Sequence, residues 1–445
     1  MNLNIELLKI TDKITYSDIF HFPTIVELEE KINSTVDKTV YSKIENLSDS
    51  YLDILKDSTQ KDKIKKYHPK NILLTGATGF LGMHILNEFI QNERGKIYCI
   101  IRNEPGITAR TKLYQKLNYY FGDKYNDLID NRIFAVTGDI TKPGFGLNQE
   151  DLLKMSNSIN IVVHSAANVS HFGNYRDFYD TNVKSVKYII NFCNSFHKKL
   201  YHISTISVSG EKLDTSYLAH TPIQQHDIVF NESSLYVGQI LDNVYAHSKF
   251  DAEHYVLDAI SKGLDGYILR MGHLMPRYKD GIFQENLLDN HIANQIISLI
   301  KIGNAPNYLL KQPLEITPID FAASAVYKLI THPSNSNRVF HIYNHNTISV
   351  EKYIKIFKKM NININVLPEQ DFQNVIKSIL KDDDSKNLLN NLINDFDKDL
   401  HFHYNSDIMI SSNFTINYLR KINFKWPKIS DKYLIRFINL LKKVI

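Results

Sequence analysis

Cysteine, long apolar runs and an excess of either charge are all scarce in this sequence, and each scarcity excludes a class of protein. Only Cys99 and Cys193 are cysteines among the 445 residues. Both lie in apolar segments, which argues against a disulfide framework and for a reducing compartment. No stretch reaches about 18 uninterrupted apolar residues, and the N-terminus lacks the basic, apolar and small-residue segments of a secretory signal. We therefore expect a cytoplasmic protein without a membrane span.

The charges are nearly balanced, with 52 lysines and arginines against 48 acids and a formal net charge of +4. The lysines are scattered among acids and asparagines instead of forming a stripe, so nucleic-acid binding is not expected. Hydrophobic residues make up 43% and charged residues 22% of the chain. This composition is typical of a globular protein, and the length allows two or three domains.

The first 34 residues have a helical pattern and do not belong to the segments that follow. Thr24 and Glu27 have the spacing of a capping box, and the helix that they begin carries Ile25, Leu28 and Ile32 on one face. Residues 35–70 are rich in Lys, Asp and Ser and show little apolar periodicity. They predict a linker.

A strand, a glycine turn and a helix follow one another from Asn71 onward. The apolar run leads into Gly76, Gly79 and Gly82, and a helical run covers residues 83–90. Glycine permits the sharp bend and lets a pyrophosphate approach the free N–H groups at the helix N-terminus. A glycine triplet alone is weak evidence, because a structural turn explains it as well. Its context of strand and helix favours a dinucleotide site.

The next strand, residues 96–102, bears on which dinucleotide binds. It ends in Arg102, where a fold that prefers NAD usually places an acid. Because a guanidinium pairs well with a 2′-phosphate, this arginine favours NADPH. Arg110 and Lys112 lie on the following predicted helix and can add to the same pocket. A solvated helix face explains these two residues equally well.

Two more strands, at residues 132–140 and 160–167, complete the predicted cofactor side. An acid at the end of the first strand commonly meets the adenine amino group, and small residues at the end of the second let the cofactor lie close to the backbone. The residues in question are Asp139, Ile140, Ser165, Ala166 and Ala167. His164 and His171 are also candidates for catalysis, but a packed or hydrogen-bonded histidine is the commoner case.

A fifth strand, residues 200–210, carries hydroxyl side chains at its C-terminal end, which faces the ligand crevice in a doubly wound sheet. Further on, Tyr245 and Lys249 lie one turn apart on a predicted helix. A nearby ammonium favours the phenolate and lowers the pKa of a tyrosine. This spacing often occurs by chance in a chain with 26 tyrosines. After five strand–helix units, a catalytic pair is the stronger interpretation.

Residues 71–276 resemble the extended short-chain dehydrogenase/reductase family. Three later stretches, residues 268–284, 314–322 and 414–427, look like the terminal thioester reductase domains of nonribosomal peptide synthetases and carboxylic acid reductases. Within residues 16–28, a D-x-F-x-x-P-T run resembles the C-terminal part of a thiolation (carrier) domain. The serine that bears phosphopantetheine in that family has no counterpart here. We therefore expect a carrier remnant over residues 1–34 and an excised portion of an assembly-line enzyme, with a native helical hairpin as the alternative.

The resemblance implies an α/β fold with a doubly wound parallel sheet over residues 71–276. Residues 277–445 would form a smaller, mostly helical substrate domain, from which residues 314–345 return to the sheet. The implied catalytic residues are Thr205, Tyr245 and Lys249. The implied cofactor contacts, beside those named above, are Thr75, Gly76, Thr78, Gly79, Phe80, Leu81, Gly82, Gly272, His273 and Leu274. The family usually has asparagine at the position of His273.

The implied reaction is NADPH-dependent release of a carrier-bound acyl or peptidyl thioester as an aldehyde, which a second hydride would convert to an alcohol. The expected partner is an upstream carrier domain, and the excised domain is expected to be a monomer. Two alternatives stay open. One is another reaction of the extended family, such as sugar-nucleotide epimerisation or dehydration. The other is a non-redox release or docking domain, in which the tyrosine is commonly lost.

Two sets of residues in the C-terminal part have both a functional and a structural interpretation. An acyl channel or plain core would explain Met275, Phe283, Leu287, Leu288 and Ile292. The spacing of His401 and His403 is that of a metal pair, but no third ligand is evident and hydride transfer needs no metal. We expect no metal site.

Overall fold

The computed structural model describes residues 64–170, 175–214, 228–241, 243–335, 338–381, 396, 400 and 406–444. The predicted carrier remnant and residues 35–63 of the predicted linker lie outside these residues. His171, His401 and His403 also lie outside them. Within the described part of the chain, no helix has both the length and the apolar character that crossing a membrane requires.

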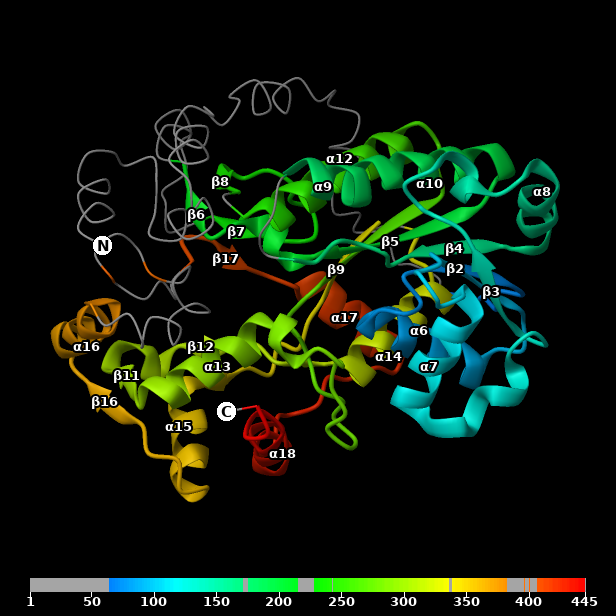
Figure 1. The fold of residues 1–445 in the computed structure, drawn as a ribbon. Helices are drawn as coiled ribbons and strands as arrows, with labels where there is room; N and C mark the ends of the chain where they lie inside the picture. The colour runs from blue at the N-terminus through cyan, green and yellow to red at the C-terminus, as the bar shows by residue number, and fades with distance from the viewer. Residues whose placement is uncertain are drawn as a thin grey trace.

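A seven-stranded sheet in the order β14-β9-β5-β4-β1-β2-β3 forms the centre of the molecule (Figure 1). All of its strand pairs are parallel. The chain adds strands on one side of β1 and then returns to add β4 on the other side, so a ligand crevice is expected at the carboxyl ends of β1 and β4. This confirms the predicted doubly wound sheet. Its strands are β1 (Ile72–Thr75), β2 (Ile97–Ile101), β3 (Ile133–Thr137), β4 (Ile161–His164), β5 (Lys199–Thr205), β9 (Gly266–Met271) and β14 (Val339–Ile342).

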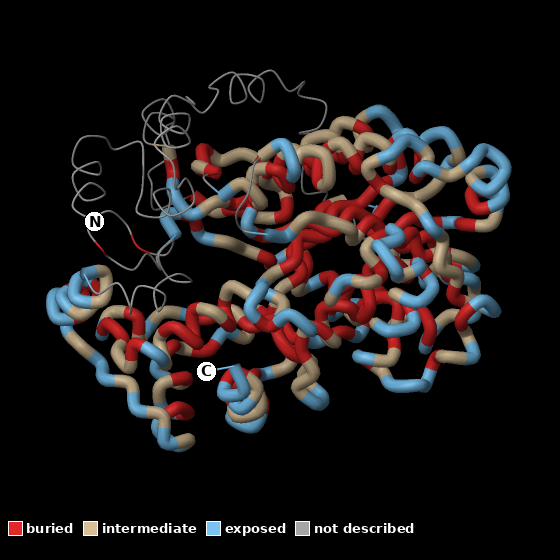
Figure 2. Tube along the Cα trace, in the orientation of Figure 1, coloured by how far each residue is buried: buried red, intermediate tan, exposed pale blue. Residues whose placement is uncertain are grey.

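Helices cover both faces of the sheet, and the buried residues concentrate along its strands (Figure 2). Alternate strand residues enter different cores, as Leu74 and Leu73 illustrate. The first face packs on α6 (Phe80–Asn92), α7 (Ala109–Phe121), α14 (Ile319–Thr331) and α17 (Asn413–Lys421). The second packs on α8 (Gln149–Ser158), α10 (Ser185–Phe196) and α12 (Val244–Ser261).

A second group of helices has its own apolar core below the sheet in Figure 1. Met275, Phe283, Leu287 and Ile292 are buried in this core, whereas Leu288 is 52% exposed. The structure thus places four of the five candidate channel residues in the packed core. The helices are α13 (His291–Ile302), α15 (Val350–Lys359) and α18 (Asp431–Leu441), and α16 (Glu369–Lys381) contributes Phe372 and Ile376 to a smaller apolar cluster beside them. Short strand pairs accompany them: β10 (Leu274–Met275) with β13 (Thr317–Pro318), β11 (Asn304–Pro306) with β16 (Asn365–Leu367), and β12 (Pro313–Leu314) with β15 (Ile348–Ser349).

Segments late in the chain return to the central sheet. Helix α14 packs on α6, strand β14 pairs with β9, and α17 covers β14. Shorter elements include α9 (Tyr175–Phe178), the π-helix η4 (Tyr179–Lys184) and the 3₁₀ helices η2 (Gly122–Leu128), η3 (Pro143–Gly146), η5 (Ile206–Ser209), η7 (Leu287–Asp289) and η8 (Asn307–Lys311). Two further strand pairs are β6 (Lys212–Leu213) with β8 (Gln239–Ile240), and β7 (Val229–Phe230) with β17 (Met409–Ile410).

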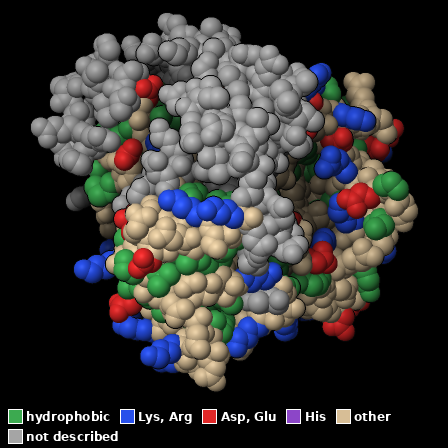
Figure 3. All heavy atoms as spheres, turned by 60° about the vertical axis from the view of Figure 1, so that its left-hand side comes forward, with side chains coloured by type: hydrophobic (Ala, Val, Ile, Leu, Met, Phe, Trp, Pro, Cys, Tyr) green, Lys and Arg blue, Asp and Glu red, His purple; other side chains and the backbone are tan. Residues whose placement is uncertain are grey.

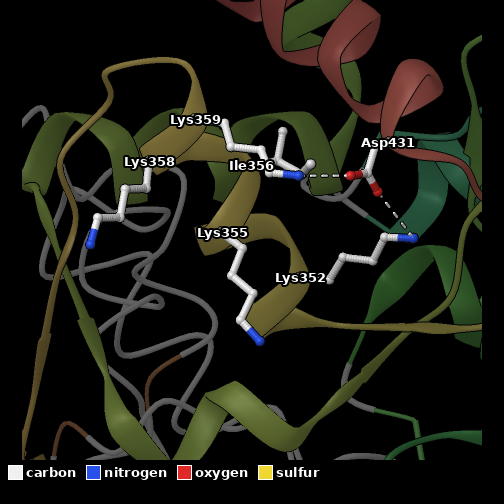
Figure 4. A pocket seen from close by; sticks show the side chains of 6 residues that line it. All are labelled: Lys352, Lys355, Ile356, Lys358, Lys359 and Asp431. Atoms are coloured by element: carbon white, nitrogen blue, oxygen red, sulfur yellow. Dashed lines mark hydrogen bonds and ion pairs between the residues drawn. The ribbon is translucent and has the colours of Figure 1, made fainter.

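Lysines concentrate on one side of α15. Four of them, with Ile356 and Asp431, line a hollow of about 590 Å³ between α15 and α18. In Figure 4, Lys352 and Lys359 point at Asp431, while Lys355 and Lys358 point elsewhere. None of the lining residues belongs to the central sheet or to α12. Over the described part of the face in Figure 3, cationic side chains are otherwise spread among acidic and hydrophobic ones.

A fully buried ion pair joins α12 to the sheet. Arg270, in β9, donates from Nη2 to Oε2 of Glu253 at 2.7 Å, and both side chains have no exposed surface. The guanidinium also donates to the Ser234 carbonyl at 2.8 Å and to Nε2 of His341 at 3.1 Å. It lies 4.7 Å from the centre of the Phe230 ring. One cation therefore connects β9, α12, β14 and the segment after β7.

Removing this arginine should destabilise the fold strongly. We expect Arg270→Met to lower the free energy of unfolding by about 3–5 kcal/mol, because Glu253 would stay buried without its counter-charge. Arg338→Met is the matched control, since Arg338 also lies over a ring, that of Tyr267, and pairs with Asp265, but is partly exposed. It should cost less than about 1 kcal/mol. Equal losses in urea denaturation would contradict this prediction.

Candidate active site

The glycine turn after β1 is packed too closely for side chains at two of its three glycines. Gly76 has φ +70°, and a Cβ there would lie 2.6 Å from the backbone N of Ala166. A Cβ on Gly82 would lie 2.0 Å from the Gly76 carbonyl oxygen. These two glycines therefore let the turn, the start of α6 and the segment after β4 approach one another.

Gly79 has a different role, because it lies exposed at the N-cap of α6. No side chain caps this helix start, and its first turn contains no acid. The first N–H groups of a helix are left without intrahelical partners and carry partial positive charge, so they suit a phosphate. The residues present here thus fit the pyrophosphate of a dinucleotide.

The three predicted 2′-phosphate cations have different surroundings. Arg102 follows β2 and is exposed, and its side chain forms no hydrogen bond or ion pair with the described residues. Arg110 instead donates to Asp130 at 2.7 Å, and Lys112 pairs with Glu104. The structure therefore leaves Arg102 available and engages the other two with acids.

The remaining predicted cofactor residues divide into open and packed positions. Ser165, Ala166 and Ala167 follow β4 beside the glycine turn, and all three are partly exposed. The carboxylate of Asp139 accepts hydrogen bonds from the backbone N and the hydroxyl of Thr141. Leu81 and Ile140 are buried. Phe80 is also packed, because its ring contacts His84, Tyr120 and Phe283. Thr75 is buried, and Thr78 is partly exposed.

The three predicted catalytic residues come together at the carboxyl end of β5. Thr205 is the last residue of β5, and its hydroxyl shares a hydrogen bond with Tyr245, in the first turn of α12. Lys249 lies one turn further along α12 and donates to the Ile203 carbonyl at 2.7 Å and to Nε2 of His202 at 3.2 Å. The Tyr245 hydroxyl and the Lys249 amine thus come from adjacent turns of one helix, against the strand that ends in Thr205.

His273 lies two residues beyond β9, at the same edge of the sheet. Its backbone N–H and its ring nitrogen Nδ1 both contact Oε2 of Glu315, at 2.7 and 2.8 Å. Gly272 beside it is needed for this approach, because a Cβ there would lie 2.7 Å from the same carboxylate oxygen. Leu274 opens β10 and is partly buried.

Comparison with known proteins identifies the family. The model of the male sterility protein family, a nicotinamide-dinucleotide-binding domain, matches residues 74–326. The chain belongs to that family. A solved thiolation-reductase di-domain from an archaeal nonribosomal peptide synthetase is 31% identical with a TM-score of 0.84, over 100% of this chain and 90% of that one. Within the family, the chain is therefore a terminal thioester reductase domain, as the sequence predicted.

Curated relatives of the reductase domain are much longer than this chain. Probable polyketide synthase 34 of Dictyostelium discoideum is 28% identical over 389 residues, which cover 80% of this chain and 12% of that protein. A linear gramicidin synthase protein from Brevibacillus parabrevis is 25% identical over 368 residues, covering 82% of this chain and 7% of that protein. The reductase domain thus spans only a small part of the relatives' length.

Burial determines the electrostatics of the reductase site. It raises the pKa of Tyr245 to about 12, although the hydrogen bond that Tyr245 shares with Thr205 acts in the opposite direction. It also lowers the pKa of Lys249 to about 8, against the nearby charge of Glu253. The sequence predicted that the ammonium would lower the pKa of the tyrosine. That prediction was wrong in direction, because desolvation dominates and the amine binds β5.

His202 is a contact of Lys249 that the sequence interpretation missed. Burial lowers its pKa well below the ordinary value and lowers that of His164, on the neighbouring strand, to about 3. Both rings are therefore neutral, and Lys249 donates to the unprotonated Nε2 of His202. His164 shares a 2.7 Å hydrogen bond with Thr75. The one available signal was the alternation of side chains between the two faces of the fifth strand. It places His202 on the face that α12 covers.

Asn182 is a second residue that the sequence interpretation missed. It is buried and bonds both backbone groups of Asn168, at 2.7 and 2.9 Å. Its amide also donates to Ser248 of α12 at 2.9 Å. Asn182 therefore ties the segment after β4 to the helix that carries Tyr245 and Lys249. No spacing rule in the sequence points to this contact.

The lowered pKa of Lys249 predicts a pH dependence of stability. Between about pH 8 and the ordinary lysine value of 10.5, the folded protein holds fewer protons than the unfolded chain. The free energy of unfolding of the wild type should therefore rise across this window relative to that of Lys249→Met. Urea denaturation at stepped pH measures the difference. Lys262→Met alters an exposed pair with Asp258, so its free energy of unfolding should change with pH as that of the wild type does. A difference between wild type and Lys249→Met that stays constant or falls with pH would refute the prediction.

Proposed function

We propose that this reductase domain releases a carrier-bound acyl or peptidyl chain by reducing its thioester to an aldehyde with NADPH. The observation that carries the proposal is the hydrogen-bonded Thr205–Tyr245 pair with Lys249 one turn away. This set lies at the sheet edge that also holds the glycine turn. The family supports reduction with a nicotinamide cofactor, and the di-domain's thiolation partner supports a carrier-bound substrate.

The proposed roles follow from charge development during the reaction. When bound, the nicotinamide supplies the hydride that the thioester carbon accepts. Negative charge then grows on the carbonyl oxygen, where Thr205 and Tyr245 would donate hydrogen bonds; one such donor typically contributes about 3–4 kcal/mol. With its pKa raised to about 12, Tyr245 stays protonated at neutral pH and can donate its proton. Lys249 would hold the nicotinamide ribose.

The partner and the domain division are part of the same proposal. An upstream carrier domain would deliver the thioester on its phosphopantetheine arm, in the cytoplasm, where thiols stay reduced. Residues 71–276 would hold the cofactor, and residues 277–445 would bind the acyl chain. The return of β14 and α14 to the central sheet is consistent with this division.

Loss of the tyrosine hydroxyl should abolish turnover without abolishing cofactor binding. We expect Tyr245→Phe to lower kcat for an acyl-pantetheine thioester by about 10²–10³-fold, the usual effect of removing an oxyanion donor. NADPH absorbance measures turnover, and calorimetry measures NADPH binding. Tyr175→Phe is the control, because Tyr175 also bonds α12, through Asp251, but lies outside the proposed catalytic set. Activity of Tyr245→Phe close to that of the control would refute the assignment.

Arg102 should determine the preference for NADPH over NADH. Replacing it with serine removes a charge-assisted contact worth about 1.5–3 kcal/mol, so KM for NADPH should rise about 10- to 100-fold while KM for NADH changes little. Arg110→Ser should have a small effect on either cofactor, because the Arg110 side chain is held by Asp130. If both cofactors weaken equally in Arg102→Ser, the residue does not read the 2′-phosphate.

A further inference from the structure

His273 and Glu315 form a built side-chain pair that the three catalytic residues do not include. Oε2 of Glu315 receives both the backbone N–H and Nδ1 of His273. Thr317 donates to Oε1 of the same carboxylate and itself accepts the backbone N–H of Asn344 at 2.8 Å. The carboxylate is therefore fixed on both oxygens, and it fixes the ring in turn.

This arrangement selects one nitrogen of His273 for chemistry. Because Nδ1 donates to Glu315, the proton available to a ligand is the one on Nε2. The His273 side chain is 46% exposed, and its Nε2 has no hydrogen-bond partner among the described residues. Partial removal from water opposes protonation, but the hydrogen bond and charge of Glu315, together with the charge of Glu211, raise the pKa of His273 above its ordinary value. The two carboxylates therefore favour the protonated ring, which carries a hydrogen on Nε2.

The sheet register places His273 close to the catalytic set. Met271 is the partner of Thr205 across β9 and β5, and His273 follows Met271 by two residues. Strand spacing and rise then put the Cα atoms of Thr205 and His273 within roughly 10 Å of each other. Glu211, whose charge acts on His273, lies in the segment that follows Thr205 and η5. The two loops therefore lie beside each other at the carboxyl end of the sheet.

We propose that His273 is the catalytic acid for cleavage of the carbon–sulfur bond, with Nε2–H protonating the sulfur of the departing thiol, and that Glu315 positions it. The inference rests on the proposed thioester reduction. An alkyl thiolate is a poor leaving group near neutral pH, because the thiol pKa is about 8.5, so a proton at sulfur speeds its departure.

The step balances in atoms and electrons. After hydride addition, the carbonyl oxygen takes the proton of Tyr245 and a hemithioacetal is formed. Its hydroxyl then returns that proton to the Tyr245 phenolate as the C=O bond of the aldehyde forms. The electrons of the C–S bond go to sulfur, which takes the proton of His273 Nε2. Solvent reprotonates the exposed ring.

Leaving-group dependence tests this role directly. NADPH oxidation and thiol release are followed together for two thioesters of the same acyl chain. The leaving group of one is pantetheine, and that of the other is an arylthiol, which departs without a proton. In His273→Gln, thiol release from the pantetheine thioester should lag NADPH oxidation and slow by about 10²-fold or more. Release from the arylthioester should change less than about threefold. Equal effects on both thioesters, or none, would overturn the proposal.

Two further variants separate chemistry from structure. Glu315→Gln keeps an acceptor for Nδ1 but removes the charge that raises the pKa of His273, so the fall in pantetheine thiol release with rising pH should begin at lower pH. An unchanged pH profile would count against the pair. His68→Gln is the matched control, because His68 also contacts a glutamate, Glu93, but follows no strand at the crevice; it should behave as wild type.

Failure of this inference differs from failure of the proposed function. If the wild type oxidises NADPH with both thioesters but His273→Gln shows no leaving-group effect, thioester reduction is supported and the role of His273 as an acid is refuted. If the wild type oxidises NADPH with neither thioester, while calorimetry shows that it binds NADPH, both thioester reduction and the role of His273 as an acid are refuted.

Discussion

A buried positive charge must be paired, and in this reductase domain that requirement positions α12, the helix that carries Tyr245 and Lys249. Arg270 lies near the carboxyl end of β9 with no exposed surface, and Glu253 of α12 neutralises it. Tyr245, Lys249 and Glu253 are spaced by four residues and so lie along one side of α12. The contact that satisfies Arg270 therefore also presents Tyr245 and Lys249 to the end of β5. The His341 contact and the carbonyl contacts of the same guanidinium join β14 and the segment after β7 to this arrangement.

Close backbone approach is the second constraint at the sheet edge. Gly76 and Gly82 are required by packing within the protein, since side chains there would collide with the segment after β4 or with the turn itself. Gly79, at the uncapped start of α6, is the glycine that leaves room for an anion. Gly272 serves the opposite side of the crevice by letting Glu315 reach His273. Some of these glycines thus permit close packing within the protein and another leaves room for a ligand. A sequence motif alone does not distinguish the two roles.

Desolvation, rather than mutual attraction, dominates the pKa shifts of Tyr245 and Lys249, the proposed catalytic pair. Burial favours the neutral form of both Tyr245 and Lys249, so it raises one pKa and lowers the other. A protonated tyrosine suits donation to a developing oxyanion. His273 differs because a carboxylate contacts it directly, and its pKa moves toward the charged form. The site therefore combines a buried, protonated tyrosine with a partly exposed histidine whose pKa lies above its ordinary value.

The sequence by itself determined the alternation of strands and helices, the glycine turn and the one-turn spacing of Tyr245 and Lys249, because these depend on local periodicity and backbone conformation. Only the tertiary structure decided that Arg102 is available while Arg110 and Lys112 are paired, because their acids come from other segments. It also decided the direction of the Tyr245 pKa shift. The pairing of His273 with Glu315, 42 residues away, was equally invisible to spacing rules. Burial and long-range contact belong to the folded chain, so no local pattern encodes them.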